Sequence, residues 1–188
     1  MCFNTGTALG VITKSFYVNE TRPRVQGSRL TSWELSRLLI PHQVVVDGCC
    51  AHLLSINKVD CIIVGCDRVA INGDTANKIN THSVAVIAYQ YGIPLYIACP
   101  VSTIDYKCKN GKQIPIEQRN VNEIKCIGNI NIANPNADCY NPAFDVTPNK
   151  FITAFITEYG ICYPPFNQSL KKVVKLQQND MINIFMIS

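Results

Sequence analysis

Residues 61–68 read Cys61-Ile62-Ile63-Val64-Gly65-Cys66-Asp67-Arg68, and residues 95–98 read Leu95-Tyr96-Ile97-Ala98. Both contain short apolar runs with the length of a strand that is buried on both faces. Between them, residues 74–91 place apolar side chains at helical spacing and end before Gly92, a residue typical of a helix C-cap. This order of strand, helix and strand predicts a β-α-β unit with parallel strands.

Other segments continue the alternation of strands and helices. Residues 31–39 predict a helix with Thr31 as N-cap and Glu34 as its capping-box partner. The remaining predicted elements are a strand at residues 44–46, a short helix at residues 51–56, and a helix that starts at Thr147-Pro148 and ends at Gly160. The pattern predicts an α/β domain, a Rossmann-like three-layer arrangement with a mostly parallel sheet.

Two stretches lack this periodicity. Residues 105–142 contain several Asn and Pro residues, so we expect a long loop, a feature that is often functional. Residues 167–188 begin with a lysine-rich part and end with an apolar part, which fits either an amphipathic packing helix or a loose tail. We therefore expect one Rossmann-like domain over residues 1–166, followed by a tail over residues 167–188.

The composition argues against several classes of protein. Of the 188 residues, 47% are hydrophobic and 16% are charged, which is not the composition of a disordered chain. The net charge of +4, without a long basic block, does not indicate a nucleic-acid-binding surface. No window approaches the roughly 18 apolar residues of a membrane span. We therefore expect a cytoplasmic globular protein with neither a nucleic-acid nor a membrane partner.

The ten cysteines show no metal-site spacing. The chain has no C-x-x-C pair and only three histidines, so we expect no bound metal. Several cysteines, such as Cys61 and Cys99, occupy positions where an apolar strand needs a small side chain. This pattern is typical of free, buried thiols in a reducing compartment.

Polar residues follow the strand that ends at Val64. Asp67 is expected at the carboxyl edge of a buried strand, where poor solvation raises a carboxyl pKa and suits general acid catalysis. The neighbouring Arg68 gives an alternative, because an ion pair with Asp67 would stabilise the carboxylate.

Asn77 and Lys78 fall in the first turn of the helix predicted at residues 74–91. Backbone N–H groups and a lysine at a helix N-terminus favour an anion such as phosphate. In the alternative interpretation, Asp74 caps the helix and Lys78 is a solvated surface residue. The usual nucleotide-binding glycine motifs are absent.

Three long motifs are more specific than the periodicity. They are NETRPRVQGSRLTSWEL at residues 19–35, IVGCDRVAINGDTANKI at residues 63–79 and NPAFDVTP at residues 141–148. They resemble the methylthioribose-1-phosphate isomerases, whose superfamily includes the regulatory subunits of the translation-initiation exchange factor. Asp67-Arg68 and Asn72-Gly73-Asp74 are similar to the enzyme branch rather than to the regulatory subunits.

The resemblance implies an aldose–ketose isomerisation in methionine salvage, in which 5-methylthioribose 1-phosphate becomes 5-methylthioribulose 1-phosphate. It implies that Asp67 is the catalytic acid and that Gln26, Asn77 and Lys78 bind the substrate. It further implies a homodimer that acts on a small phosphorylated sugar and uses neither a metal nor an organic cofactor.

The sequence departs from the family pattern near its start. Family members have a helical N-terminal domain, so we expect this chain to correspond to the C-terminal domain alone. Their catalytic cysteine lies in a His-Cys-Asn stretch, and Cys2 is either that cysteine at a displaced spacing or an unrelated residue. Two other interpretations stay open: a non-catalytic regulatory subunit related to the exchange factor, and an incomplete gene model.

Overall fold

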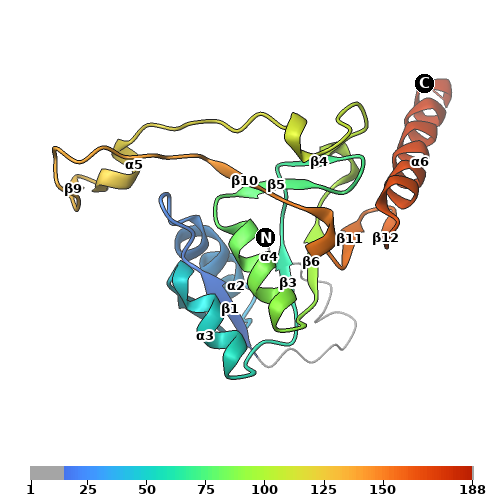
Figure 1. Ribbon diagram of the computed structural model, residues 1–188. Helices are drawn as coiled ribbons and strands as arrows, with labels where there is room; N and C mark the ends of the chain where they lie inside the picture. Colours follow the sequence, from blue (N-terminus) through green and yellow to red (C-terminus); the bar gives the residue numbers. More distant parts are fainter. Residues whose placement is uncertain (1–14, 188) are drawn as a thin grey trace. The chain divides into compact units, whose positions relative to one another are not determined.

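The computed structural model describes residues 15–187, with side chains described for residues 15–180. Cys2 therefore lies outside the described residues. The chain divides into two compact units, and Figure 1 shows the order of their elements. The first unit contains the described residues up to Leu53 together with Glu117–Ala143, and the second contains Leu54–Ile116 and the residues from Phe144 onward.

The second unit is built on a four-stranded sheet with the strand order β12-β11-β6-β3. Strands β3 (Ile62–Val64), β6 (Leu95–Ala98) and β11 (Ala154–Thr157) are parallel, and β12 (Gly160–Cys162) is antiparallel to β11. The predicted α/β class with parallel strands is confirmed. Because β3 is an edge strand of this sheet, Cys61 beside it is exposed, and its expected burial is wrong.

A β-hairpin precedes the crossover helix. Strands β4 (Arg68–Ala70) and β5 (Thr75–Lys78) are antiparallel, and they join β10 (Phe144–Thr147) and β7 (Ile104–Asp105) in a sheet of order β10-β5-β4-β7. The helix predicted from residue 74 begins only at Thr81. The physical reason is the Asn72-Gly73 turn, in which Gly73 has a φ of 94°. Such turns favour hairpins.

Helix α4 (Thr81–Gln90) connects this hairpin to β6. It buries Val84, Ala85 and Ala88 and contacts β6 and β10. Gly92 follows the helix with a φ of 68°, so the expected glycine at its C-terminal end is confirmed.

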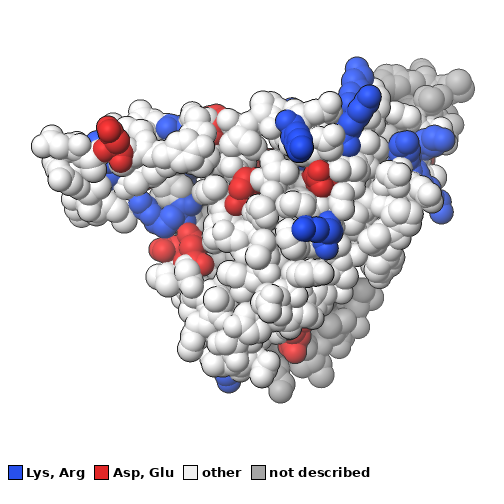
Figure 2. Space-filling model, viewed as in Figure 1, with Lys and Arg blue, Asp and Glu red and all other residues white. Residues whose placement is uncertain are grey.

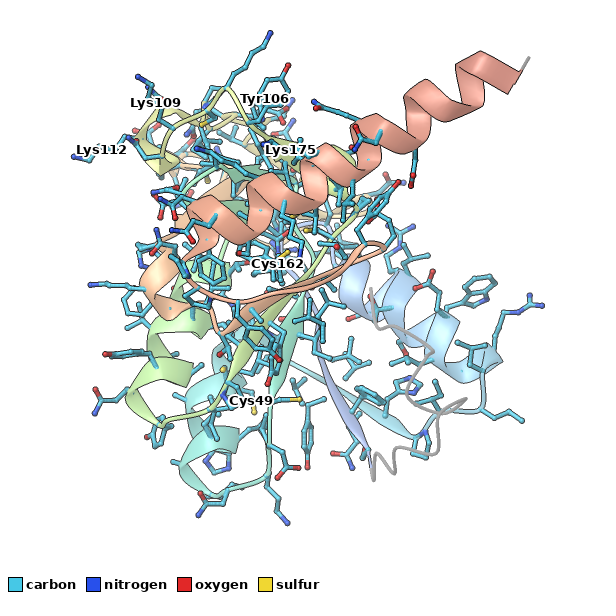
Figure 3. All side chains as sticks on the ribbon, turned by 90° about the vertical axis from the view of Figure 1, so that its right-hand side faces the viewer. Cys49, Tyr106, Lys109, Lys112, Cys162 and Lys175 are labelled. Atoms are coloured by element: carbon cyan, nitrogen blue, oxygen red, sulfur yellow. The ribbon has the colours of Figure 1, made fainter. Side chains whose placement is uncertain are left out.

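Helix α6 (Phe166–Ile187) resolves the two alternatives for the end of the chain. Its buried side chains recur at helical spacing: Phe166, Leu170, Val173 and Val174. The Phe166 ring packs edge-on against the fully buried Phe155, with 4.9 Å between the ring centroids. Figure 3 shows Cys162 beneath this helix. Residues 167–187 therefore form a packing helix of the second unit. None of the described helices is long and apolar enough to cross a membrane.

The helix predicted between Thr147 and Gly160 is wrong. After β10, the chain makes a single 3-10 turn, η5 (Asn149–Phe151), and continues as β11. Ala154 and Phe155 are fully buried because β11 lies inside the sheet, between β6 and β12. Tertiary burial has therefore overridden the local helix-start signal at Thr147-Pro148.

The first unit contains β1 (Phe16–Asn19) and β2 (His42–Val45), which are parallel, and between them the π-helical turn η1 (Gly27–Thr31) and helix α2 (Ser32–Arg37). Val18, Leu35 and Ile40 form its core. The predicted helix and strand are confirmed, but the capping box is wrong. Thr31 makes no side-chain cap, because the chain is already helical from Gln26.

The remaining elements are short. After β2 come η2 (Asp47–Cys49) and the predicted short helix, observed as α3 (Cys50–Ser55). The 3-10 turn η3 (Val101–Thr103) comes directly after β6. The expected long loop over residues 105–142 contains η4 (Gly111–Gln113), α5 (Asn122–Lys125), β8 (Cys126–Ile127) and β9 (Ile130–Asn131). The two ends of this loop run antiparallel, because Gln118 and Pro142 form an antiparallel bridge and the Ala143 N–H donates to the Glu117 carbonyl at 2.8 Å.

Candidate functional site

Asp67 lies just beyond the carboxyl end of β3, where the chain enters the hairpin. Its backbone N–H donates to the Ala76 carbonyl at 2.9 Å, and Ala76 is also the register partner of Arg68. Two consecutive residues thus face one residue of β5, as in a β-bulge, a feature that redirects side chains near functional sites. The Asp67 side chain is exposed, so the expected poorly solvated setting is wrong.

Arg68 has an ion pair with Asp105. Its Nη1 atom lies 3.9 Å from Asp105 Oδ2, and both side chains are well exposed to solvent. A pair of this kind contributes at most about 1 kcal/mol to stability.

Asn77 and Lys78 lie on β5 rather than in the first turn of a helix, which corrects the prediction. Successive side chains of a strand point to opposite faces, so these two diverge. On one face, Asn77 Nδ2 donates to Thr81 Oγ1 at 3.1 Å. On the other, Lys78 Nζ lies 5.1 Å from the centroid of the Phe144 ring, a cation–π distance.

The N-terminus of α4 is occupied by a carboxylate of the protein itself. Asp145, the register partner of Asn77, accepts hydrogen bonds from the N–H groups of Asn80 at 2.7 Å and His82 at 3.0 Å. Burial raises the pKa of Asp145, while the two N–H donors and the nearby His82 act in the opposite direction. The N–H groups of Asn80 and His82 at the start of α4 are therefore already used by Asp145.

Asp74 does not cap a helix. Its carboxylate accepts hydrogen bonds from Asn72 Nδ2, Gly111 N–H and Asn149 N–H, each at 2.9 Å. Burial raises the pKa of Asp74, but the three donors outweigh it and lower the pKa overall. Asp74 thus joins the hairpin turn to two later segments of the second unit.

Gln26 belongs to the first unit and directly precedes η1. Its Oε1 atom is buried and has no hydrogen-bond partner among the described residues. The next residue must be glycine, because a Cβ atom at Gly27 would collide with the Asn19 carbonyl. Asp67, Asn77 and Lys78 share the second unit, whereas Gln26 lies in the other.

The described residues contain no group of three or more His, Cys, Asp and Glu side chains that would hold a metal ion. On the face drawn in Figure 2, the Lys and Arg side chains stand in separate groups among uncharged atoms. The arrangement around Asp67 thus offers one exposed carboxyl group, an amide on the neighbouring strand and a lysine at the end of that strand. Such groups suit proton transfer and the binding of a polar ligand.

The sequence alone did not identify the two carboxylates, Asp74 and Asp145, that fix the positions of the site residues. Asp145 and Asp74 act as acceptors for backbone N–H groups of segments that are distant along the chain. No local pattern indicates the partner of Asp145. The Asn72-Gly73 dipeptide, however, is a hairpin signal and would have placed Asn77 on a strand.

Comparison with known proteins decides the family. The model of the initiation factor 2 subunit family matches residues 2–164, which is most of the chain. The chain belongs to this family.

Relatives in the initiation factor 2 subunit family include enzymes. The methylthioribose-1-phosphate isomerase of Caldicellulosiruptor saccharolyticus is 49% identical over 176 residues, which cover 89% of this chain and 52% of the relative. The chain thus spans about half the length of the curated relatives it matches.

Solved structures of the family share the fold. The 5-methylthioribose 1-phosphate isomerase of Pyrococcus horikoshii has a TM-score of 0.87 at 43% identity, over 92% of this chain and 48% of that one. The translation initiation factor eIF-2B, subunit delta, of A. fulgidus has a TM-score of 0.81 at 42% identity, over 85% of this chain and 46% of that one.

Proposed function

We propose that this chain carries the catalytic half of an aldose–ketose isomerase that converts 5-methylthioribose 1-phosphate to 5-methylthioribulose 1-phosphate in methionine salvage. The observation that carries the proposal is the 49% identity, over 89% of the chain, to a relative named methylthioribose-1-phosphate isomerase. The position of Asp67 at the end of a parallel strand supports it, because ligands of α/β sheets bind beyond the carboxyl ends of the strands.

In this proposal Asp67 is the proton donor. Opening the sugar ring places negative charge on the ring oxygen, and a carboxyl group within hydrogen-bond reach neutralises it. Because C1 carries the phosphate, the opened sugar is a phosphorylated oxocarbenium at C1 rather than a free aldehyde. The hydrogen of C2 then moves to C1, and the C2 hydroxyl gives its proton back to the Asp67 carboxylate as C2 becomes the ketone. A carboxyl group keeps its proton at neutral pH when water is excluded around it. Because Asp67 is exposed in the free chain, we infer that the bound sugar excludes the water.

Gln26, Asn77 and Lys78 are proposed to bind the substrate. The side-chain amides of Gln26 and Asn77 both donate and accept hydrogen bonds, which suits sugar hydroxyls. The lysine offers a positive charge to the phosphorylated sugar. Because Asn77 and Lys78 point to opposite faces of β5, a ligand that contacts both must lie at the end of that strand, where the chain turns toward α4.

The decisive experiment measures conversion of 5-methylthioribose 1-phosphate to the ketose by the wild-type chain and by Asp67→Asn. Each is assayed alone and as a fusion in which it replaces the matching half of the Pyrococcus horikoshii isomerase. We expect Asp67→Asn to lower turnover roughly 10²- to 10⁴-fold while the circular dichroism spectrum stays unchanged. Asp60→Asn, at an exposed position on the approach to β3, is the matched control. Equal turnover of wild type and Asp67→Asn in the fusion contradicts the assignment.

The structure of the A. fulgidus initiation-factor subunit supports a second candidate function, since it matches this chain nearly as well. In that case the chain is a non-catalytic regulatory subunit of an exchange factor. It would then form a stable complex with other initiation-factor subunits and leave the sugar phosphate unchanged. Co-purification by size-exclusion chromatography, run beside the turnover assay, separates the two functions.

We also propose that the chain forms a homodimer in the cytoplasm. Several apolar side chains of the Glu117–Ala143 segment are exposed, which is typical of a surface that contacts another protein.

A further inference from the structure

Cys66 and Cys99 occupy equivalent positions on two neighbouring strands. In the register of β3 and β6, Val64 pairs with Ile97, and each cysteine comes two residues later. The two cysteines are therefore at matching register positions, just beyond the carboxyl ends of adjacent parallel strands. Neighbouring strands are about 4.8 Å apart, which falls within the roughly 4.4–6.8 Å between Cα atoms that a disulfide spans.

The two sulfur atoms already interact in the thiol form. A side-chain hydrogen bond joins Cys66 to Cys99, and Cys66 Sγ lies 3.2 Å from Thr103 Oγ1. The hydrogen bond from Cys66 lowers the pKa of Cys99, although burial opposes it. The same bond, together with burial, raises the pKa of Cys66. Cys99 is therefore the thiol of the pair that loses its proton more readily.

The other thiols near this sheet are less well placed. Cys162 is separated from β6 by the intervening strand β11, and its thiol donates to the Ser169 carbonyl at 3.7 Å, under α6 (Figure 3). Cys108 donates to the Asn110 carbonyl at 3.3 Å. Cys61 is exposed at the other end of β3.

We propose that Cys66 and Cys99 form an oxidation site at which a hydroperoxide converts the two thiols to a reversible disulfide. Cys66 is partly exposed and Cys99 is only 3% exposed, so the site admits a small oxidant and shields the pair from larger thiols. Neither residue has a part in the proposed isomerisation.

The chemistry balances with one hydroperoxide. With hydrogen peroxide, the Cys99 sulfur attacks one peroxide oxygen, the O–O bond breaks, and the leaving oxygen takes up the Cys99 proton as water; an organic hydroperoxide leaves as its alcohol. The Cys66 sulfur then attacks the Cys99 sulfenic acid. The S–O bond breaks, the S–S bond forms, and the departing hydroxide leaves with the Cys66 proton as a second water. A dithiol reductant restores both thiols.

This disulfide bears on the proposed function, because Cys66 directly precedes Asp67. An S–S bond of about 2.05 Å is shorter than any contact between two thiols, so it draws Cys66 toward β6 and shifts the adjacent Asp67 relative to Ala76. Displacement of a reacting group by about 1 Å costs roughly a hundredfold in rate. This consequence rests on the isomerase function, whereas the disulfide itself does not.

Peptide mapping of the full chain tests the proposal. The protein is treated with hydrogen peroxide, its remaining thiols are blocked, and it is digested with trypsin without reduction. We expect residues 59–68 to be joined to residues 79–107, which contain Cys99 as their single cysteine. The link should persist in Cys61→Ser and disappear in Cys66→Ser, and dithiothreitol should reverse it. Cys162→Ser is the matched buried control and should leave the link intact.

Blocked thiols at both Cys66 and Cys99 after peroxide treatment overturn the proposal, as does a link from either of them to another cysteine. Cys66→Ser and Cys99→Ser are both made, so that misfolding of one variant does not decide the result. In a catalytically active form, oxidation should lower turnover roughly a hundredfold in wild type and leave Cys66→Ala unaffected. Unchanged turnover of the fully linked protein contradicts the coupling to Asp67. An inactive reduced chain counts against the isomerase function alone.

Discussion

Asp74 shows how a single carboxylate organises the second unit. It receives three hydrogen bonds, two of them from backbone N–H groups far along the chain, at Gly111 and Asn149. Gly111 has no room for a side chain there, because a Cβ atom would lie 3.0 Å from Asp74 Cβ and 2.5 Å from Val146 Cγ1. The hairpin turn that sets the direction of β5, and so of Asn77, is therefore fixed from outside the hairpin.

We expect Asp74→Ala to lower the free energy of unfolding by about 2 kcal/mol, because it leaves polar donors without their acceptor. Urea denaturation monitored by circular dichroism measures this loss. Asp60→Ala, at an exposed aspartate of the same unit, is the control and should cost less than about 0.5 kcal/mol. Equal midpoints for the two variants would show that the Asp74 bonds add nothing to stability.

The contribution of Asp74 also depends on pH. The pKa of Asp74 is lower in the folded chain than in the unfolded chain, because folding stabilises the carboxylate form relative to the protonated form. The stabilisation is thus fully present above the unfolded pKa of about 3.9 and declines as the pH falls through the folded pKa. The gap in unfolding free energy between wild type and Asp74→Ala should therefore narrow between pH 7 and pH 3. A gap that widens on acidification contradicts the assignment.

Individual site residues were predictable to different degrees. Asp67 was expected at the carboxyl end of a strand because the apolar run before it is unambiguous, and the structure has it there. Its solvation was not predictable, because exposure depends on neighbours from the whole fold. The setting of Asn77 and Lys78 was mistaken, since a hairpin of two short strands and the first turn of a helix share the same apolar spacing over so few residues.

Helices and strands were predictable where one strong local signal dominates. The apolar runs at β3 and β6 and the glycine after α4 are such signals. By contrast, β11 follows a proline that normally starts a helix, and only its place beside β6 makes it a strand. Helix α6 was ambiguous for a related reason. Its apolar face is buried only by tertiary contacts, such as the packing of Phe166 against Phe155, and the local sequence does not show them.

Helix α6 should be essential to the second unit. Burying each of its large apolar side chains contributes about 1.5–3 kcal/mol, and together they rival the roughly 5–15 kcal/mol that stabilises a typical domain. We expect a chain that ends at Phe166 to lose its cooperative thermal transition and to bind the dye ANS. A chain that ends at Asp180 keeps all four buried positions and should melt like the wild type. A cooperative transition in the shorter chain would show that the helix is dispensable.

The division into two units follows from contacts that no local pattern encodes. The segment Glu117–Ala143 belongs with the residues before Leu54, although more than sixty residues separate them in the chain. Within the first unit, Arg22 Nη2 donates to the Ile124 carbonyl at 3.1 Å, and the Arg24 guanidinium pairs with Glu123. After Ile116 the chain leaves the second unit, contributes Glu117–Ala143 to the first unit, and then returns to the second. In the sequence this excursion appears only as a long loop.

The same segment carries the last prediction, on the proposed homodimer. Ile130 is 69% exposed and Tyr140 is 77% exposed, which leaves apolar surface in contact with water. If a second copy of the chain covers it, light scattering at micromolar concentration should give twice the mass of one chain. Ile130→Asp should then give a monomer, because burying a charge without a partner in an interface costs several kcal/mol. Lys112→Asp, an exposed change of charge in the second unit, is the control and should stay dimeric. A wild-type monomer, or an Ile130→Asp dimer, contradicts this assignment of the interface.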